Sequence, residues 1–179
     1  MKNLSLSLDA LSKEELKELI RINAGNFLAL DGTWFQAVEK EEGMDKALYY
    51  DREAWRVYTE IEARKLKKFL KLPEYPGLDG LEQALSLRFA SFANRETICQ
   101  RNGNILVYKV VDCRVQSARK RKGMPYHPCK SVGFVEYAYF AKIIDKRIEC
   151  EALSCYPDVT DNTCACAWKF VQKNNSGDI

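Results

Sequence analysis

Residues 81–116 read LEQALSLRFASFANRETICQRNGNILVYKVVDCRVQ, and the hydrophobic period of the chain changes within them. Up to about Phe92 the apolar residues recur at helical spacing, whereas beyond it they alternate with polar ones, as in half-buried strands. The Asn102-Gly103 pair is typical of a tight hairpin turn. The stretch therefore predicts a helix over 81–92 and strands over 93–100 and 104–116.

Helical patterns precede this stretch, and both helical and strand patterns follow it. Ser12 and Glu15 form a capping box, which marks the start of a long helix. The other predicted elements are helices over 13–42, 45–71 and 130–144 and strands over 147–155 and 165–172. The sequence thus predicts an α+β fold in which N-terminal helices pack on a four-stranded antiparallel sheet, with one helix inserted between the second and third strands.

The composition is that of one ordinary domain. The chain has 179 residues, of which 46% are apolar, and this is enough for one core. We predict a single domain over 1–179, with a helical half (1–92), a sheet half (93–173) and a flexible tail (174–179). A net charge of +3 does not favour nucleic-acid binding. Because no stretch approaches the ~20 apolar residues of a membrane span, we expect a cytoplasmic protein without a membrane partner. The sequence does not decide whether the protein forms a homo-oligomer.

Seven cysteines occur in the chain, all of them from Cys99 onward. In a reducing compartment they are expected to be buried apolar residues, metal ligands or reactive thiols rather than disulfides. Four of them lie at the ends of predicted strands or at the start of a predicted helix: Cys113, Cys129, Cys155 and Cys166. Such ends can converge at one edge of an antiparallel sheet. Cys99, Cys150 and Cys164 are expected to pack in the core.

These four thiols support two interpretations. As soft ligands they would suit zinc or an iron–sulfur centre, although their spacing is not the paired C-x2-C of common zinc sites. Alternatively, Cys113 or Cys129 is a nucleophile, and the helix start at Cys129 favours its thiolate. His127, the single histidine, or Asp158 would then be the base. An exposed loop histidine is the more ordinary interpretation of His127.

Polar residues in both halves of the chain are further candidates for the site. The basic segment CRVQSARKRKG (113–123) contains Arg114, Gln116 and Arg119, which could hold an anionic group. Asn23, Asp31 and Glu62 interrupt apolar helical faces. Since burial of such groups is costly unless they are paired, we expect them to be buried and hydrogen-bonded, with Arg64 or Tyr58 as candidate partners.

Several long segments also match a family pattern, among them NFLALDGTWFQAVEKEEGMDKAL, WRVYTEIEARKLKKFL, PCKSVGFVEYAYFAKIIDKRIE and CAWKF. The chain resembles an uncharacterised family of small cytosolic proteins from anaerobic prokaryotes. More remotely, it is similar to L-2-amino-thiazoline-4-carboxylic acid hydrolases and 4-vinyl-reductase domains. The resemblance implies helices before an antiparallel sheet, and it implies site residues at Cys113, Cys129, Cys155, Asp158, Cys166, Asn26, Asp31 and Trp34.

Two functional hypotheses follow from these observations. The first is a cysteine-lined protein whose partner is a metal or a small molecule. The alternative is a cysteine-dependent hydrolase of a small carboxylated or amide-like compound, because thiol nucleophiles act on such groups.

Overall fold

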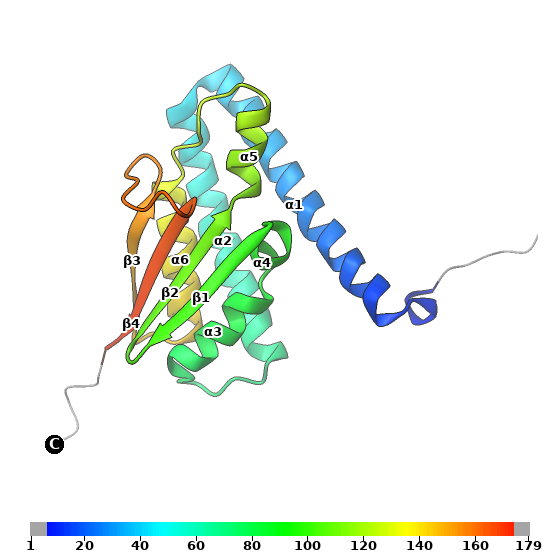
Figure 1. The fold of residues 1–179 in the computed structure, drawn as a ribbon, viewed down its shortest axis with the longest axis vertical. Helices are drawn as coiled ribbons and strands as arrows, with labels where there is room; N and C mark the ends of the chain where they lie inside the picture. Colours follow the sequence, from blue (N-terminus) through cyan, green and yellow to red (C-terminus); the bar gives the residue numbers. More distant parts are fainter. Residues whose placement is uncertain (1–6, 174–179) are drawn as a thin grey trace, which may run out of the picture.

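The structure, a computed structural model, describes residues 7–173, and the tail predicted at 174–179 lies outside them. The helices are α1 (Lys13–Glu42), α2 (Met44–Phe69), α3 (Gly77–Leu87), α4 (Phe89–Ala93), α5 (Arg114–Arg121) and α6 (Lys130–Ile144). The strands are β1 (Glu96–Asn102), β2 (Ile105–Asp112), β3 (Ile148–Cys155) and β4 (Cys166–Gln172). The strands form one antiparallel sheet in the order β1-β2-β4-β3 (Figure 1). The predicted α+β class and the four-stranded sheet are confirmed.

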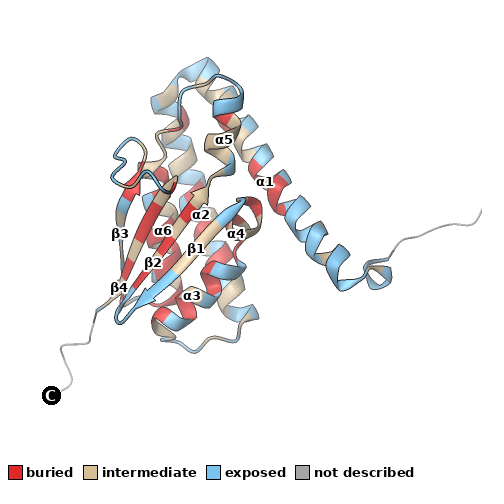
Figure 2. Ribbon diagram, viewed as in Figure 1, coloured by how far each residue is buried: buried red, intermediate tan, exposed pale blue. Residues whose placement is uncertain are grey.

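The two long N-terminal helices form an antiparallel pair. The predicted capping box starts α1, where Ser12 Oγ accepts from the Glu15 backbone N–H. Gly43 separates α1 from α2 with a φ of 82°, a value that favours glycine. Only the C-terminal part of α1 lies along α2, and the N-terminal part extends away from the body as an exposed helix (Figures 1 and 2). This arrangement places the C-terminal half of α1 beside the site described below.

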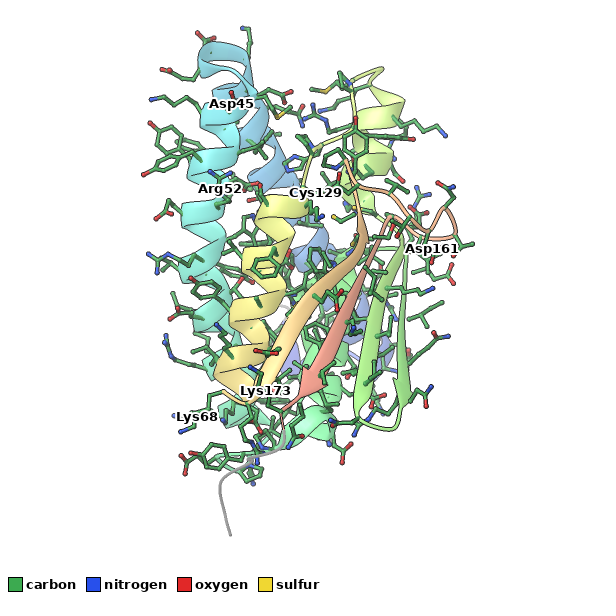
Figure 3. The ribbon with its side chains drawn as sticks, turned by 90° about the vertical axis from the view of Figure 1, so that its left-hand side faces the viewer. Asp45, Arg52, Lys68, Cys129, Asp161 and Lys173 are labelled. Atoms are coloured by element: carbon green, nitrogen blue, oxygen red, sulfur yellow. The ribbon has the colours of Figure 1, made fainter. Side chains whose placement is uncertain are left out.

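The core lies between the sheet and α6, and α2 covers the other side of α6 (Figure 3). Tyr108 of β2 and Trp168 of β4 are directly opposite each other in the sheet and are almost completely buried. Tyr137 of α6 stacks on Trp168 with the ring centroids 4.8 Å apart. Large aromatic side chains thus fix how α6 lies on the sheet.

Three details of the prediction are wrong. The helix predicted over 81–92 is interrupted at Arg88, whose extended backbone separates α3 from α4. The strand predicted over 104–116 ends at Asp112, since the basic run after it folds as α5. Two helices, α5 and α6, therefore lie between the second and third strands. Arginine, lysine, glutamine and alanine all favour helices, and this propensity acts without the apolar period that we used as the helix signal.

Close packing of α6 on the sheet depends on Gly133. A Cβ atom at this position would lie 2.7 Å from Cζ2 of the buried Trp168. We expect Gly133→Ala to lower the free energy of unfolding by about 1–2 kcal/mol, because the clash outweighs the better helix propensity of alanine. Gly32→Ala in α1 is the matched control, since its Cβ would meet only Gln36 Nε2 at 3.9 Å. Urea unfolding should show the control unchanged or stabilised. Equal effects at both positions would contradict the prediction.

Within the described part of the chain, none of the helices has both the length and the apolar character needed to cross a membrane.

Candidate functional site

A cavity of about 310 Å³ lies at the end of the sheet where β2 and β3 finish and β4 begins. Helices α1, α2, α5 and α6 enclose it together with the sheet. Much of its wall is apolar and comes from Leu28, Phe35, Trp55, Val132 and Tyr137. The four cysteines considered for a shared site, Cys113, Cys129, Cys155 and Cys166, all line it. The fold therefore brings these thiols together from four separate segments.

The thiols meet because of the strand register and the start of α6. Cys155 at the end of β3 is paired across the sheet with Cys166 at the start of β4. Cys129 precedes α6, and its Sγ lies 3.6 Å from Cys155 Sγ. Figure 3 shows Cys129 at the N-terminal end of α6, beside the end of β3. Trp168 donates its indole N–H to Cys166 Sγ over 3.3 Å. The sulfurs of Cys129, Cys155 and Cys166 thus each have a defined neighbouring side chain.

The cavity thiols differ in acidity. The sulfurs of Cys129 and Cys155 share a hydrogen bond, which lowers the pKa of Cys129 below its ordinary value because the Cys155 thiol can donate to a Cys129 thiolate, and burial opposes this only in part. The pKa of Cys155 is raised by the same bond, by Cys166 and by burial. Burial raises the pKa of Cys113 to about 12. Cys129 is therefore the candidate for a thiolate.

Alkylation rates can test this order of acidity. At pH 7 we expect iodoacetamide to modify Cys129 faster than Cys113, because the thiolate is the reacting form. Cys155→Ala removes the S–H donor and should slow the modification of Cys129. Cys99→Ala changes a cysteine outside the cavity lining and serves as the control. Peptide mass spectrometry over time gives each rate. Faster reaction at Cys113, or faster reaction at Cys129 in the Cys155→Ala variant, would refute the assignment.

Three carboxyl groups line the same cavity: Asp31 from α1, Asp51 from α2 and Glu136 from α6. Burial raises the pKa of Asp31 to about 6. Burial, followed by the negative charges of Asp31 and Glu136, raises that of Asp51 to about 8. Burial raises that of Glu136 to about 7, although Arg88 opposes the shift. Near neutral pH this part of the wall therefore holds protons that ordinary carboxyl groups would have lost.

The buried guanidinium of Arg88 forms an ion pair with Glu136. Arg88 is fully buried, and its Nη2 lies 2.8 Å from Glu136 Oε1 and 3.0 Å from Glu62 Oε2. Glu62 also accepts the backbone N–H of Phe89, the first residue of α4. Glu62 is thus buried and paired as expected, but its side-chain partner is Arg88 rather than Arg64 or Tyr58.

His127 is buried, so its interpretation as an exposed loop residue is wrong. Its ring packs on Phe35 with the centroids 4.4 Å apart, and its Nε2 lies 3.8 Å from Asp51 Oδ2. Burial and then the charge of Arg119 lower the pKa of His127 to about 4, so the imidazole is neutral at pH 7. Among the described residues, no hydrogen bond joins its ring to Cys129. The Cys129–His127 pair, which was the alternative interpretation of His127, is therefore not formed in this structure.

Two of the three residues expected to hold an anion already have structural partners. Both Nη atoms of Arg119 donate to the Glu39 carboxylate at 2.7 Å. Gln116 accepts the backbone N–H of His127 and donates to its carbonyl, which fixes the loop before α6. Gln116 Nε2 also lies 3.7 Å from Cys129 Sγ. Arg114 lines the cavity but is exposed and lies against Gly25 of α1.

Several candidate residues lie outside the cavity wall. Asn26 and Trp34 are exposed on α1, and the exposed Asp158 pairs with Lys130 at 2.7 Å. Asn23 is also exposed, and its side chain donates to the Leu19 carbonyl of its own helix, so its predicted burial is wrong. The buried face of α1 runs through Ala24, Leu28 and Phe35, and the exposed residues of this helix lie on its other faces. Cys99 and Cys150 pack against the core, and Cys164 is buried, as expected.

Sequence reasoning missed Asp51, Arg88 and Glu136. Two sequence signals could have found some of them. Glu136 is the single acidic residue in the otherwise apolar segment of α6, and a charge in such a setting requires a partner. Asp51 lies four residues before Trp55, which puts both on one face of α2. Arg88 has no such local signal, since its partners are distant in sequence.

Among residues 7–173, no group of three or more His, Cys, Asp or Glu side chains is arranged so that it could hold a metal ion. The expected zinc or iron–sulfur centre therefore stays a prediction.

One protein-family model matches the chain, over residues 9–172, and its description is a family of unknown function, DUF6125. No curated protein and no solved structure matches the chain. The match extends from before α1 to the end of β4, so it includes every residue of the cavity wall.

Proposed function

The chain belongs to this family of unknown function, and we propose that it binds a small molecule in the cysteine-lined cavity. The observation that carries the proposal is the cavity of about 310 Å³, whose largely apolar wall also contains a few polar groups from separate helices. Small-molecule sites have this size and composition, since apolar walls supply affinity and a few polar groups fix orientation.

The rigidity of the wall supports the same proposal. Tyr137 and Trp168 are buried and stacked on each other, and both line the cavity. Phe35 is held against the ring of His127. A preformed cavity binds with a smaller loss of side-chain entropy than one that must be ordered by its ligand. The described cysteines are free thiols, which fits a protein that works in the reducing cytoplasm.

A substitution at Gly32 can test the proposal. This residue lines the cavity from α1, and a Cβ there meets only Gln36 Nε2 at 3.9 Å, so a larger side chain has room to enter. A library of small compounds is screened by ligand-observed NMR against the unmodified protein, Gly32→Phe and Gly32→Ala. We expect compounds that bind the unmodified and Gly32→Ala proteins but not Gly32→Phe. If no compound is lost selectively in Gly32→Phe, the cavity is not the binding site.

A second candidate function is cysteine-dependent hydrolysis, and the lowered pKa of Cys129 favours it. The resemblance to amino-thiazoline carboxylate hydrolases points to the same chemistry. Incubation with p-nitrophenyl acetate should then release p-nitrophenolate and leave an acetyl group on Cys129. Cys129→Ala should abolish both signals, whereas Cys99→Ala should not. Acetylation spread evenly over the cysteines would speak against an activated nucleophile.

A further inference from the structure

We propose that the ligand of this cavity carries a positive charge, which binds among Asp31, Asp51 and Glu136. A small amine or amidine with an apolar body is the chemical class that fits. This inference rests on the proposed function, because it specifies the ligand of the same cavity.

The geometry around Asp51 carries the inference. Its side chain is only 9% exposed and lines the cavity. Within the described residues its nearest basic nitrogen is His127 Nε2, and 3.8 Å is too long for a hydrogen bond. The indole N–H of Trp55 favours the ionised forms of both Asp51 and Asp31. One indole N–H is therefore shared by two carboxyl groups. Each carboxyl group can accept several hydrogen bonds, so some of its acceptor sites are left without a donor. A cationic donor in the cavity would supply the missing hydrogen bonds.

The charges around the cavity are also unbalanced. The buried guanidinium of Arg88 pairs with Glu62 and Glu136, whereas Asp31 and Asp51 have no ion pair with it. The other buried guanidinium at the cavity, that of Arg119, is paired with Glu39. The charge of Arg52, next to Asp51 in α2, favours ionised Asp51, but it is the smallest of the effects on this carboxyl group, and Arg52 Nη1 is directed to Ser131 Oγ over 3.4 Å. The neutral His127 adds no charge. The buried end of the cavity thus has an excess of acidic groups.

Basic residues at the rim do not balance this excess. Arg114, Arg121 and Lys122 line the cavity but are exposed. Exposed charges are screened by water and salt, whereas buried ones interact more strongly. The buried carboxyl groups therefore determine which ligand charge is favoured inside the cavity. If the exposed basic residues at the rim dominated instead, an anion would bind.

Compounds of equal shape and different charge can test the inference. Benzamidine, benzamide and benzoate share a ring and a planar head group but are cationic, neutral and anionic at pH 8. Dissociation constants are measured by ligand-observed NMR, and cyclohexyl and butyl sets (amine, alcohol, carboxylate) repeat the comparison. We expect each cation to bind at least tenfold more tightly than its neutral partner, with the anion weakest. Cation binding should also release protons, because it favours the ionised carboxylates.

Variants separate a role in charge recognition from a role in folding. Asp51→Asn is expected to weaken benzamidine binding at least tenfold and to leave benzamide binding unchanged. Asp158→Asn, which changes an exposed carboxyl group outside the cavity, should leave both unchanged. Urea unfolding confirms that each variant is folded.

Two results overturn the inference. In one, the neutral or anionic member of the sets binds as tightly as the cation. The proposed function then survives as long as Gly32→Phe still removes binding. In the other, nothing in the sets or in the compound library binds in a Gly32-dependent way, and the proposed function falls together with the inference.

Discussion

Arg88→Met is expected to lower the free energy of unfolding by about 3–5 kcal/mol at pH 8, because removal of one partner strands buried charges. Arg88 is fully buried, contacts Glu62 and Glu136, and lies over the ring of Phe140 at 4.8 Å. Its Nε and Nη1 have no hydrogen-bond partner among the described residues, so the aromatic faces and the two carboxylates hold it. Methionine fills similar space without charge, and the two carboxylates would then lie together unpaired.

The pH dependence identifies the cause of this loss. Without Arg88, protonation of Glu136 relieves the repulsion between the two carboxylates, so the stability of Arg88→Met relative to the unmodified protein should rise as the pH falls from 8 to 5.5. Arg64→Met is the control, because Arg64 pairs with Glu60 on an exposed part of α2. An exposed pair of this kind contributes well under about 1 kcal/mol. Similar urea midpoints for the two variants at pH 8 would show that the buried ion pairs do not stabilise the fold.

Local sequence signals predicted most of the elements correctly. The bounds of α1 and α6 agree with those predicted, since each has a long apolar period and a clear start. The hairpin between β1 and β2 turns at Gly103, as the Asn-Gly pair predicts. The break at Arg88 could not be predicted this way. It depends on ion pairs to residues 26 and 48 positions away in the chain, and such contacts leave no periodic signal nearby.

The candidate site was predicted in part. Cysteines at strand and helix ends were expected to converge, and Cys155 and Cys166 are indeed opposite each other in the sheet. The acidic side of the cavity was not foreseen beyond Asp31. Asp51 lies on α2 between the exposed Tyr50 and the partly exposed Arg52, and only the packing of α2 against α1 and α6 turns it inward. Which face of a helix meets a cavity depends on tertiary contacts, which a one-dimensional pattern does not contain.

Asp51→Asn is expected to stabilise the folded protein by on the order of 2 kcal/mol at pH 8. The pKa of Asp51 is raised from 3.8 to about 8 by burial and by the neighbouring Asp31 and Glu136. Between these two values the folded state holds a proton that the unfolded chain has lost. The contribution of Asp51 is therefore most favourable below about pH 4 and is lost as the pH rises toward 8. Asparagine does not titrate and avoids this loss.

Urea unfolding at pH 4.5 and pH 8 measures this effect. The gain of Asp51→Asn over the unmodified protein should be largest at pH 8 and small at pH 4.5, where the aspartate and the asparagine are both neutral in the folded protein. Asp158→Asn changes an exposed aspartate paired with Lys130, and its effect should stay within about 0.5 kcal/mol at pH 8. A destabilised Asp51→Asn at pH 8 would mean that the carboxylate has a stabilising partner in the folded protein. Together with the expected loss of benzamidine binding, the gain in stability would show that Asp51 is retained for recognition at a cost to the fold, as is common at binding sites.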